Sequence, residues 1–99
     1  MTYRLILSPE AEQDILAILE YSHENWGEDY ARTYLSKLEH GLELLQNNPH
    51  IGRVRDDISN IHRGFLIGQH IAIYFISDDM IYLSRIFHQS RDWFGQDIP

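Results

Sequence analysis

Two residues near the end of the sequence, Arg85 and His88, have the clearest potential for chemistry. They stand in a largely apolar run that ends a hairpin-like stretch, and Arg63 precedes that stretch. An imidazole can transfer a proton, and guanidinium groups can stabilise the charge that develops on a phosphorane. These are the residue types that cleavage of RNA needs, so their relative placement decides whether they form a catalytic set.

The strands that carry these residues are predicted to form an antiparallel meander. The dipeptides at 68–69 and 78–79 fit two-residue hairpin turns between the strands. In the register that these turns set, Arg63 and Arg85 point to one face of the sheet and His88 points to the other. A single β-bulge would change this register. The pattern therefore favours no assembled triad.

Arg85 also has a structural interpretation, in which it pairs with a carboxylate such as Asp56 or Asp92 at a sheet edge. The sequence offers little else for phosphate chemistry. Lys37 is the only lysine, and no tyrosine follows His88. Both interpretations of Arg85, catalytic and structural, stay open at this level.

Two amphipathic helices are predicted before these strands. Ser8 can cap a helix that starts at Pro9, and the apolar stripe of this helix reaches Trp26. Gly27 separates it from a second helix, over about 28–46, whose apolar residues recur at alternating spacings of four and three. A break this short predicts an antiparallel helical hairpin.

The predicted strands cover residues 2–7, 61–67, 70–77 and 80–88. Segment 50–60 is predicted to be a polar connector. The resulting order is β-α-α-β-β-β, which predicts an α+β fold: a two-layer sandwich with the helical hairpin packed on an antiparallel sheet. The 99 residues form a single domain, 1–99, with a flexible tail at about 93–99.

Composition narrows the class of protein. The net charge of −7, with nine acidic and two basic side chains in residues 9–47, argues against specific nucleic-acid binding. The absence of cysteine excludes disulfides and thiolate metal sites. No apolar run reaches the roughly 20 residues of a membrane span, and the first residues lack a signal-peptide pattern. We therefore expect a cytoplasmic protein that does not enter a membrane.

Six histidines invite a metal hypothesis, but none of them shows a short ligand spacing. The expected cross-strand neighbours are Phe75 for His62 and Phe87 for His70. We therefore expect neither a zinc site nor any other cofactor.

Four aromatic residues gather around the predicted helix junction: Tyr21, Trp26, Tyr30 and Tyr34. The simpler interpretation is a small core that clamps the helical hairpin. The functional alternative is a surface that receives a helix of a partner protein.

Trp93 and Phe94 stand out in the polar tail. Large aromatic side chains are costly to expose, so these two either fold back onto the sheet or form a contact surface. In the connector, Arg53 and Arg55 belong either to a solvated loop or to a site that grips an acidic segment of a partner.

Short motifs occur in order along nearly the whole chain, between Tyr3 and Asp92. They are Ser8-Pro9-Glu10-Ala11-Glu12, Asp14-Ile15, Tyr21, Trp26-Gly27, Asn48-Pro49, Gly52-Arg53, Arg63, Gly68-Gln69-His70-Ile71, Tyr74 and Arg85-Ile86-Phe87-His88-Gln89. No single motif is specific. As an ordered set, they resemble the ParE branch of the RelE/ParE toxin superfamily of bacterial toxin–antitoxin systems.

The resemblance implies a function. ParE-like toxins stall DNA gyrase after DNA cleavage, and an antitoxin encoded beside them wraps them with its C-terminal segment. RelE-like relatives instead cut messenger RNA on the ribosome. The residues that we expect to contact the target are Arg63, Arg85, His88, Trp93 and Phe94. The residues that we expect to contact the antitoxin are Tyr30, Tyr34, Arg53 and Arg55.

The sequence thus predicts a non-catalytic toxin that poisons DNA gyrase and forms a hetero-oligomer with its antitoxin. Two alternatives remain. One is a ribosome-dependent mRNA endonuclease of the RelE type, and the other is a module that binds the antitoxin without being toxic.

Overall fold

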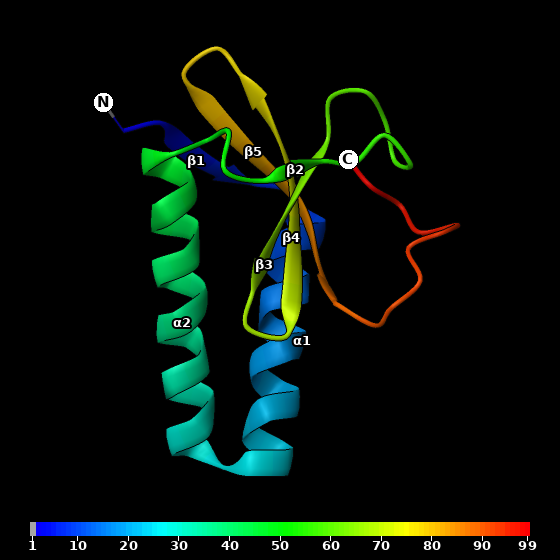
Figure 1. Ribbon diagram of the computed structural model, residues 1–99. Coiled ribbons are helices and arrows are strands. Elements are labelled where there is room, and N and C mark those ends of the chain that lie inside the picture. Colours follow the sequence, from blue (N-terminus) through cyan, green and yellow to red (C-terminus); the bar gives the residue numbers. More distant parts are fainter. Residues whose placement is uncertain (1) are drawn as a thin grey trace.

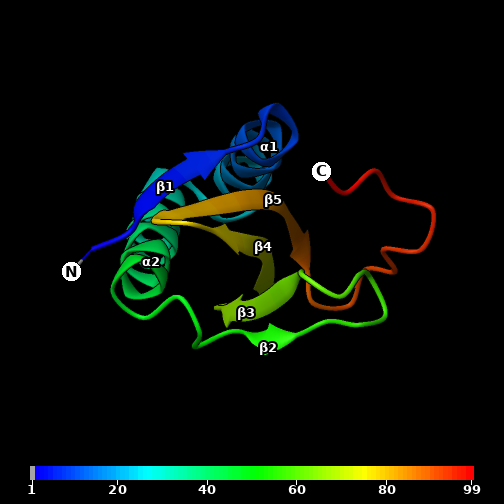
Figure 2. The same cartoon turned by 90° about the horizontal axis from the view of Figure 1, so that it is seen from above.

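The computed structural model describes residues 2–99 and shows two helices packed on a five-stranded sheet (Figure 1). The elements are β1 (Arg4–Leu7), α1 (Pro9–Trp26), α2 (Glu28–Asn47), β2 (Arg53–Val54), β3 (Arg63–Ile67), β4 (His70–Ser77) and β5 (Met80–His88). The predicted α+β fold is therefore confirmed. The strand order is β1-β5-β4-β3-β2, as Figure 2 shows from above.

Two details differ from the expected sheet. β1 pairs with β5 in parallel, whereas all other strand pairs are antiparallel. The connector also contains β2, a strand of two residues that pairs with β3 at the far edge. A strand this short has no periodic pattern of apolar residues, so it could not be predicted from the sequence.

The helical hairpin begins and turns where the sequence predicts. The Ser8 hydroxyl caps α1 by accepting the amide of Ala11 at 2.9 Å, and it donates to the carbonyl of Ser84 at 2.7 Å. Gly27, with φ +95°, links α1 to α2 in a backbone conformation that other residues rarely adopt. The first cap therefore also ties the helix to β5.

A bulge shifts the register between β4 and β5. Tyr74 pairs with Leu83, and its neighbour Ile73 pairs with Arg85, so Ser84 is the extra residue. The C-terminal half of β5 is consequently one residue out of the predicted register. His70 lies opposite His88, and the predicted pairing with Phe87 is wrong.

The core lies between the helices and the sheet. Its fully buried side chains include Leu38 and Leu45 from α2 and Ile81 and Leu83 from β5. Tyr74 extends this core to the connector, because its hydroxyl donates to the carbonyl of Pro49 at 2.7 Å and accepts the amide of Gly52 at 2.9 Å. No helix in residues 2–99 is long and apolar enough to cross a membrane.

The far end of the helical hairpin projects past the turn between β3 and β4 (Figure 1). Trp26 lies at this end and is 63% exposed, so its predicted place in the buried stripe of α1 is wrong. The periodic pattern continues to Trp26, but the sheet that would cover it ends earlier.

Candidate functional site

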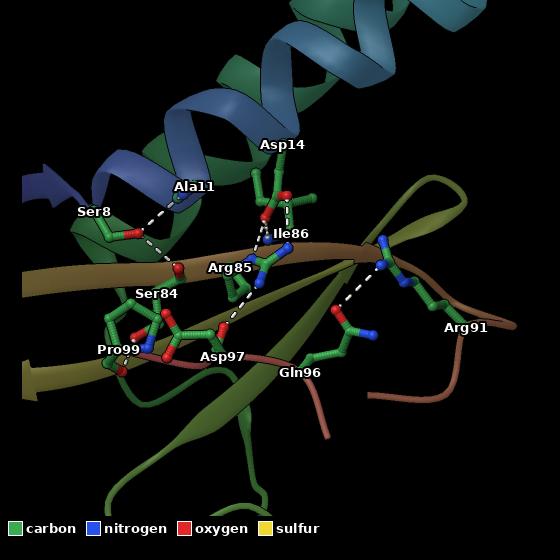
Figure 3. Close-up of polar contacts among 10 residues, drawn as sticks. All are labelled: Ser8, Ala11, Asp14, Ser84, Arg85, Ile86, Arg91, Gln96, Asp97 and Pro99. Carbon is green, nitrogen blue, oxygen red and sulfur yellow. Dashed lines mark hydrogen bonds and ion pairs between the residues drawn. The ribbon is translucent and has the colours of Figure 1, made fainter. Parts of the chain in front are cut away.

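Arg85 is held by a carboxylate from α1. Its Nε and Nη2 donate to the two carboxylate oxygens of Asp14 at 2.7 and 3.0 Å (Figure 3). Both side chains are nearly buried, with exposed fractions of 12% and 13%. The hydrogen bonds that Arg85 donates to Asp14 are the main cause of the raised pKa of Arg85. The structural interpretation of Arg85 is therefore the right one, although its partner is Asp14 instead of Asp56 or Asp92.

Asp14 also completes the edge of the sheet. β1 ends at Leu7, so beyond Leu83 the strand β5 is paired with β4 on one side and has no strand on the other. At this position the Asp14 carboxylate accepts the amide of Ile86 at 2.9 Å (Figure 3). An acidic residue next to the buried stripe of α1 was the available sequence signal for this role.

Arg63 is separated from Arg85. His88 lies opposite His70, on the same face as Arg63 but four residues farther along β4. Arg63 pairs with Tyr74, whereas Arg85 pairs with the neighbouring Ile73, so the two arginines point to opposite faces of the sheet. The prediction that they share a face is wrong because of the bulge. The Arg63 guanidinium instead donates to the carbonyl of Gly52 at 2.8 Å and holds the connector.

The C-terminal segment lies against the sheet through main-chain oxygens. Arg85 donates to the carbonyl of Asp97, and the Ser84 hydroxyl donates to the oxygen of Pro99, both at 2.8 Å (Figure 3). His62 Nε2 lies at the same distance from the Pro99 oxygen. These contacts place the segment but do not measure its motion, so the flexibility expected for residues 93–99 stays a prediction.

The two tail aromatics differ in environment. The guanidinium of Arg55 lies over the Trp93 ring, 4.1 Å from its centroid, and is paired with Asp57 at 3.0 Å. Phe94 is 89% exposed. Trp93 therefore folds back onto the connector, and Phe94 presents its ring to solvent. Arg53 is exposed on the edge strand β2.

A groove of about 560 Å³ runs between the helical hairpin and the ends of β4 and β5. A continuous row of rings follows it: Trp26, Tyr30, Tyr34, His70 and His88. The centroids of successive rings are 5.7, 6.2, 5.4 and 5.4 Å apart. The sequence missed this row because the bulge brings His88 beside His70.

The aromatic cluster at the helix junction is not a closed core. Tyr34 is buried, but Tyr21 and Trp26 are each 63% exposed and Tyr30 is 45% exposed. The core interpretation is thus wrong for three of the four residues. All four line the groove.

Tyr34 and His70 form a short polar relay in the floor of the groove. The Gln69 amide donates to the Tyr34 hydroxyl oxygen at 2.9 Å, and that hydroxyl lies 2.5 Å from His70 Nδ1. Burial, with a smaller contribution from His88, lowers the pKa of His70 to about 4. The ring is therefore neutral near pH 7, with its Nδ1 hydrogen-bonded to the Tyr34 hydroxyl. Within residues 2–99, no three acidic or histidine side chains are arranged to hold a metal ion.

Comparison with known proteins identifies the family. Residues 5–93 match the family described as "ParE toxin of type II toxin-antitoxin system, parDE". The chain belongs to this family. It is 33% identical to the ParE1 toxin of Mycobacterium tuberculosis over 93% of this chain and 95% of that protein. It is 27% identical to the ParE1 toxin of Caulobacter vibrioides over 87% of this chain and 88% of that protein.

A solved structure of a toxin–antitoxin system shares the ParE fold. The structure is of the chromosomal ParDE system from P. aeruginosa, with a TM-score of 0.76 at 18% identity. The similarity covers 88% of this chain and 96% of that chain. At this identity it supports the fold alone.

Proposed function

We propose that this ParE family member acts on DNA gyrase in the cytoplasm, blocks replication, and is held inactive by a cognate antitoxin. The observation that carries the proposal is the family match over residues 5–93, together with relatives that are similar over nearly their whole length. Two structural neighbours are described as toxin–antitoxin systems, which supports an antitoxin partner and a hetero-oligomer.

The geometry supports a non-catalytic mode of action. RNA cleavage requires a base and cations around one phosphate. Here Arg85 is neutralised by Asp14, and Arg63 holds the connector on the other face of the sheet. Without a shared location, these side chains offer no centre for phosphoryl chemistry. This weakens the ribosome-dependent endonuclease alternative.

The aromatic groove is the best candidate for the antitoxin contact. Its rings are spaced by 5.4–6.2 Å, close to the roughly 5.4 Å pitch of an α-helix, so successive turns of a docked helix can meet successive rings. Of the predicted contacts, Tyr30 and Tyr34 belong to this groove. Arg53 and Arg55 lie instead near the β2 edge and would form a separate contact.

The C-terminal segment is the best candidate for the target contact. Phe94 has the largest exposed fraction of the large apolar side chains in residues 2–99, so it would bury the most apolar surface if a partner covered it. Phe94 therefore stands first among the predicted target contacts. Trp93 is the preceding residue and packs against Arg55 of the connector, while Arg63 and Arg85 serve the fold.

A gyrase assay tests this function. Purified protein is incubated with gyrase, ATP and relaxed plasmid, and supercoiling and trapped cleaved DNA are measured. We expect loss of supercoiling and accumulation of cleaved DNA, both prevented by prior addition of the cognate antitoxin. Full supercoiling activity without trapped DNA would refute gyrase as the target.

A translation extract provides the discriminating control. The same protein preparation is added to translating ribosomes, and messenger RNA ends are mapped. We expect no new cleavage sites. Codon-positioned cuts that disappear in Arg85→Ala would favour the endonuclease. Antitoxin binding without any growth arrest in cells would favour a non-toxic binding module.

A further inference from the structure

The two ends of the aromatic groove differ in charge. At the end formed by β4 and β5, the groove is lined by His70, His88 and Arg91. Asp14 is the only carboxylate that lines the groove among residues 2–99, and it is already bound by Arg85 and the Ile86 amide. This end therefore presents donors without an available acidic partner.

The hydrogen bonds set the orientation of both imidazole groups. The Ser90 amide donates to His88 Nδ1 at 3.2 Å, which leaves Nε2 of that ring as its N–H donor. The Tyr34 hydroxyl is paired with His70 Nδ1, so Nε2 is the ring nitrogen of His70 that is left for a ligand. The Nε2 atoms of both rings are consequently available to meet a ligand.

Arg91 adds a permanent positive charge. Its Nη2 donates to the neutral side chain of Gln96 at 3.1 Å (Figure 3), and its guanidinium lies 5.3 Å from the Phe87 ring centroid. In the part of the chain that the structure describes, it forms no ion pair, unlike Arg85. A guanidinium with no carboxylate partner is well suited to bind one.

We propose that His70, His88 and Arg91 form a carboxylate-binding subsite for a glutamate or aspartate side chain of the docked antitoxin segment. This inference rests on the proposed function, because it assumes that the antitoxin occupies the groove. The other end of the groove belongs to the tip of the helical hairpin, where Glu24 is exposed and forms no ion pair within residues 2–99, while Glu28 is paired with Arg32 at 2.8 Å. The charge contrast fixes the direction of the docked segment, with its acidic end at β5.

A peptide carboxylate fits this site better than a nucleic-acid backbone does. Residues 9–47, which form the helical side of the groove, carry nine acidic and two basic side chains. Although only Asp14 among these acids lines the groove, their summed charge repels a polyanion at long range more strongly than it repels a single carboxylate. The subsite therefore recognises one acidic side chain on a protein segment.

Isothermal titration of the cognate antitoxin into the full-length toxin tests the subsite. We expect Arg91→Gln and His88→Gln each to weaken binding about tenfold, as removal of a charge-assisted hydrogen bond does. Arg4→Gln and His40→Gln are matched controls at exposed positions outside the groove and should bind like the wild type. Thermal unfolding confirms that each variant is folded.

Proton uptake during antitoxin binding distinguishes a carboxylate-binding role of the histidines from a purely structural one. A bound carboxylate favours protonated imidazole, so binding should take up protons and tighten as the pH falls from 7.5 to 5.5. Repeating the titration in buffers of different ionisation enthalpy measures this uptake, which should decrease in His88→Gln. The other ionisable side chains that line the groove with the two rings are Asp14, Tyr21, Tyr30, Tyr34 and Arg91.

The outcomes separate the two proposals. If the wild-type toxin does not bind the antitoxin, the proposed function fails and the subsite fails with it. If the antitoxin binds, but Arg91→Gln and His88→Gln bind like the wild type without proton uptake, only the subsite is refuted. Binding of a ten-nucleotide RNA that is lost in Arg91→Gln would also refute it, in favour of a phosphate site.

Discussion

At the scale of single residues, the same side chain types can serve chemistry or structure, and their partners decide which. Arg85 has the charge that a phosphate site needs, yet Asp14 binds it in two places and Asp97 accepts a third hydrogen bond. A guanidinium held in this way has its charge compensated before any ligand arrives. Arg91, six residues later, has no such carboxylate partner within residues 2–99.

The Asp14–Arg85 pair should contribute strongly to stability. Asp14→Ala leaves the Arg85 guanidinium nearly buried without its carboxylate and removes the acceptor for the Ile86 amide. We expect the free energy of unfolding to fall by about 3 kcal/mol, measured by urea denaturation. Asp29→Ala is the control, because the Asp29 carboxylate is fully exposed and its removal should have little effect. Equal stability of both variants would contradict a structural role for the pair.

His70 should make stability depend on pH. Its pKa is lowered to about 4 in the folded protein and rises to about 6.5 when the chain unfolds. The unfolded state therefore binds the proton more readily than the folded state does. The stabilisation that neutral His70 contributes is complete above pH 6.5 and is lost as the pH falls toward 4. Allowing for solvent screening of this half-exposed ring, the loss is about 2 kcal/mol.

Urea denaturation of the wild type and His70→Gln at pH 7 and pH 4.5 measures this contribution. The decrease in stability between the two pH values should be smaller in the variant. Since carboxylates titrate in both proteins, only the difference between the two decreases reports on His70. Identical decreases, matched by His40→Gln, would show that His70 is not involved.

At the scale of elements, the position where α2 crosses β3 depends on a missing side chain. A Cβ atom on Gly41 would lie 2.6–2.7 Å from three side-chain atoms of Ile67. Because these atoms include both branches at the β-carbon of Ile67, rotation of its side chain cannot move all of them away. α2 can therefore pack this closely on β3 only with glycine at position 41.

Gly41→Ala sets helix propensity against this steric conflict. Alanine favours a helix over glycine by about 1 kcal/mol. Overpacking a buried contact costs about 1–3 kcal/mol. We expect a net loss of about 1 kcal/mol in the free energy of unfolding, measured by thermal denaturation. Ser36→Ala, at an exposed position of α2, should instead keep or slightly raise stability, and a stabilised Gly41→Ala would contradict the close packing.

Most elements could be predicted from the sequence because their signals are local. The cap at Ser8, the turn at Gly27 and the two-residue turns between strands are encoded by the residues that form them. The bulge at Ser84 depends instead on how α1 and the tail meet β5. This bulge sets the face of the sheet on which Arg85 lies, and it places His88 opposite His70. The candidate site could therefore not be predicted from the sequence.

At the scale of the whole molecule, the two candidate contact surfaces are formed by different parts of the chain. The groove is lined largely by the helical hairpin and the ends of β4 and β5, whereas Phe94 belongs to the C-terminal segment. Figure 2 shows that segment at the side of the molecule, beyond β5 and away from α2. Antitoxin binding and target binding should therefore be separable by single substitutions.

Phe94→Ser tests this separation. The ring is 89% exposed, so its removal should leave stability unchanged, and it does not line the groove, so the antitoxin should bind with wild-type affinity. A buried aromatic anchor at an interface contributes at least about 2 kcal/mol, so gyrase inhibition should weaken by at least tenfold. Titration with the antitoxin measures antitoxin affinity, and the supercoiling assay measures gyrase inhibition, on one preparation.

Leu16→Ser is the control. It removes an exposed apolar side chain that lies on α1, and the variant should inhibit gyrase like the wild type. If Phe94→Ser inhibits gyrase as strongly as Leu16→Ser, the target contact lies elsewhere on the molecule, and the isolated exposure of Phe94 needs another explanation.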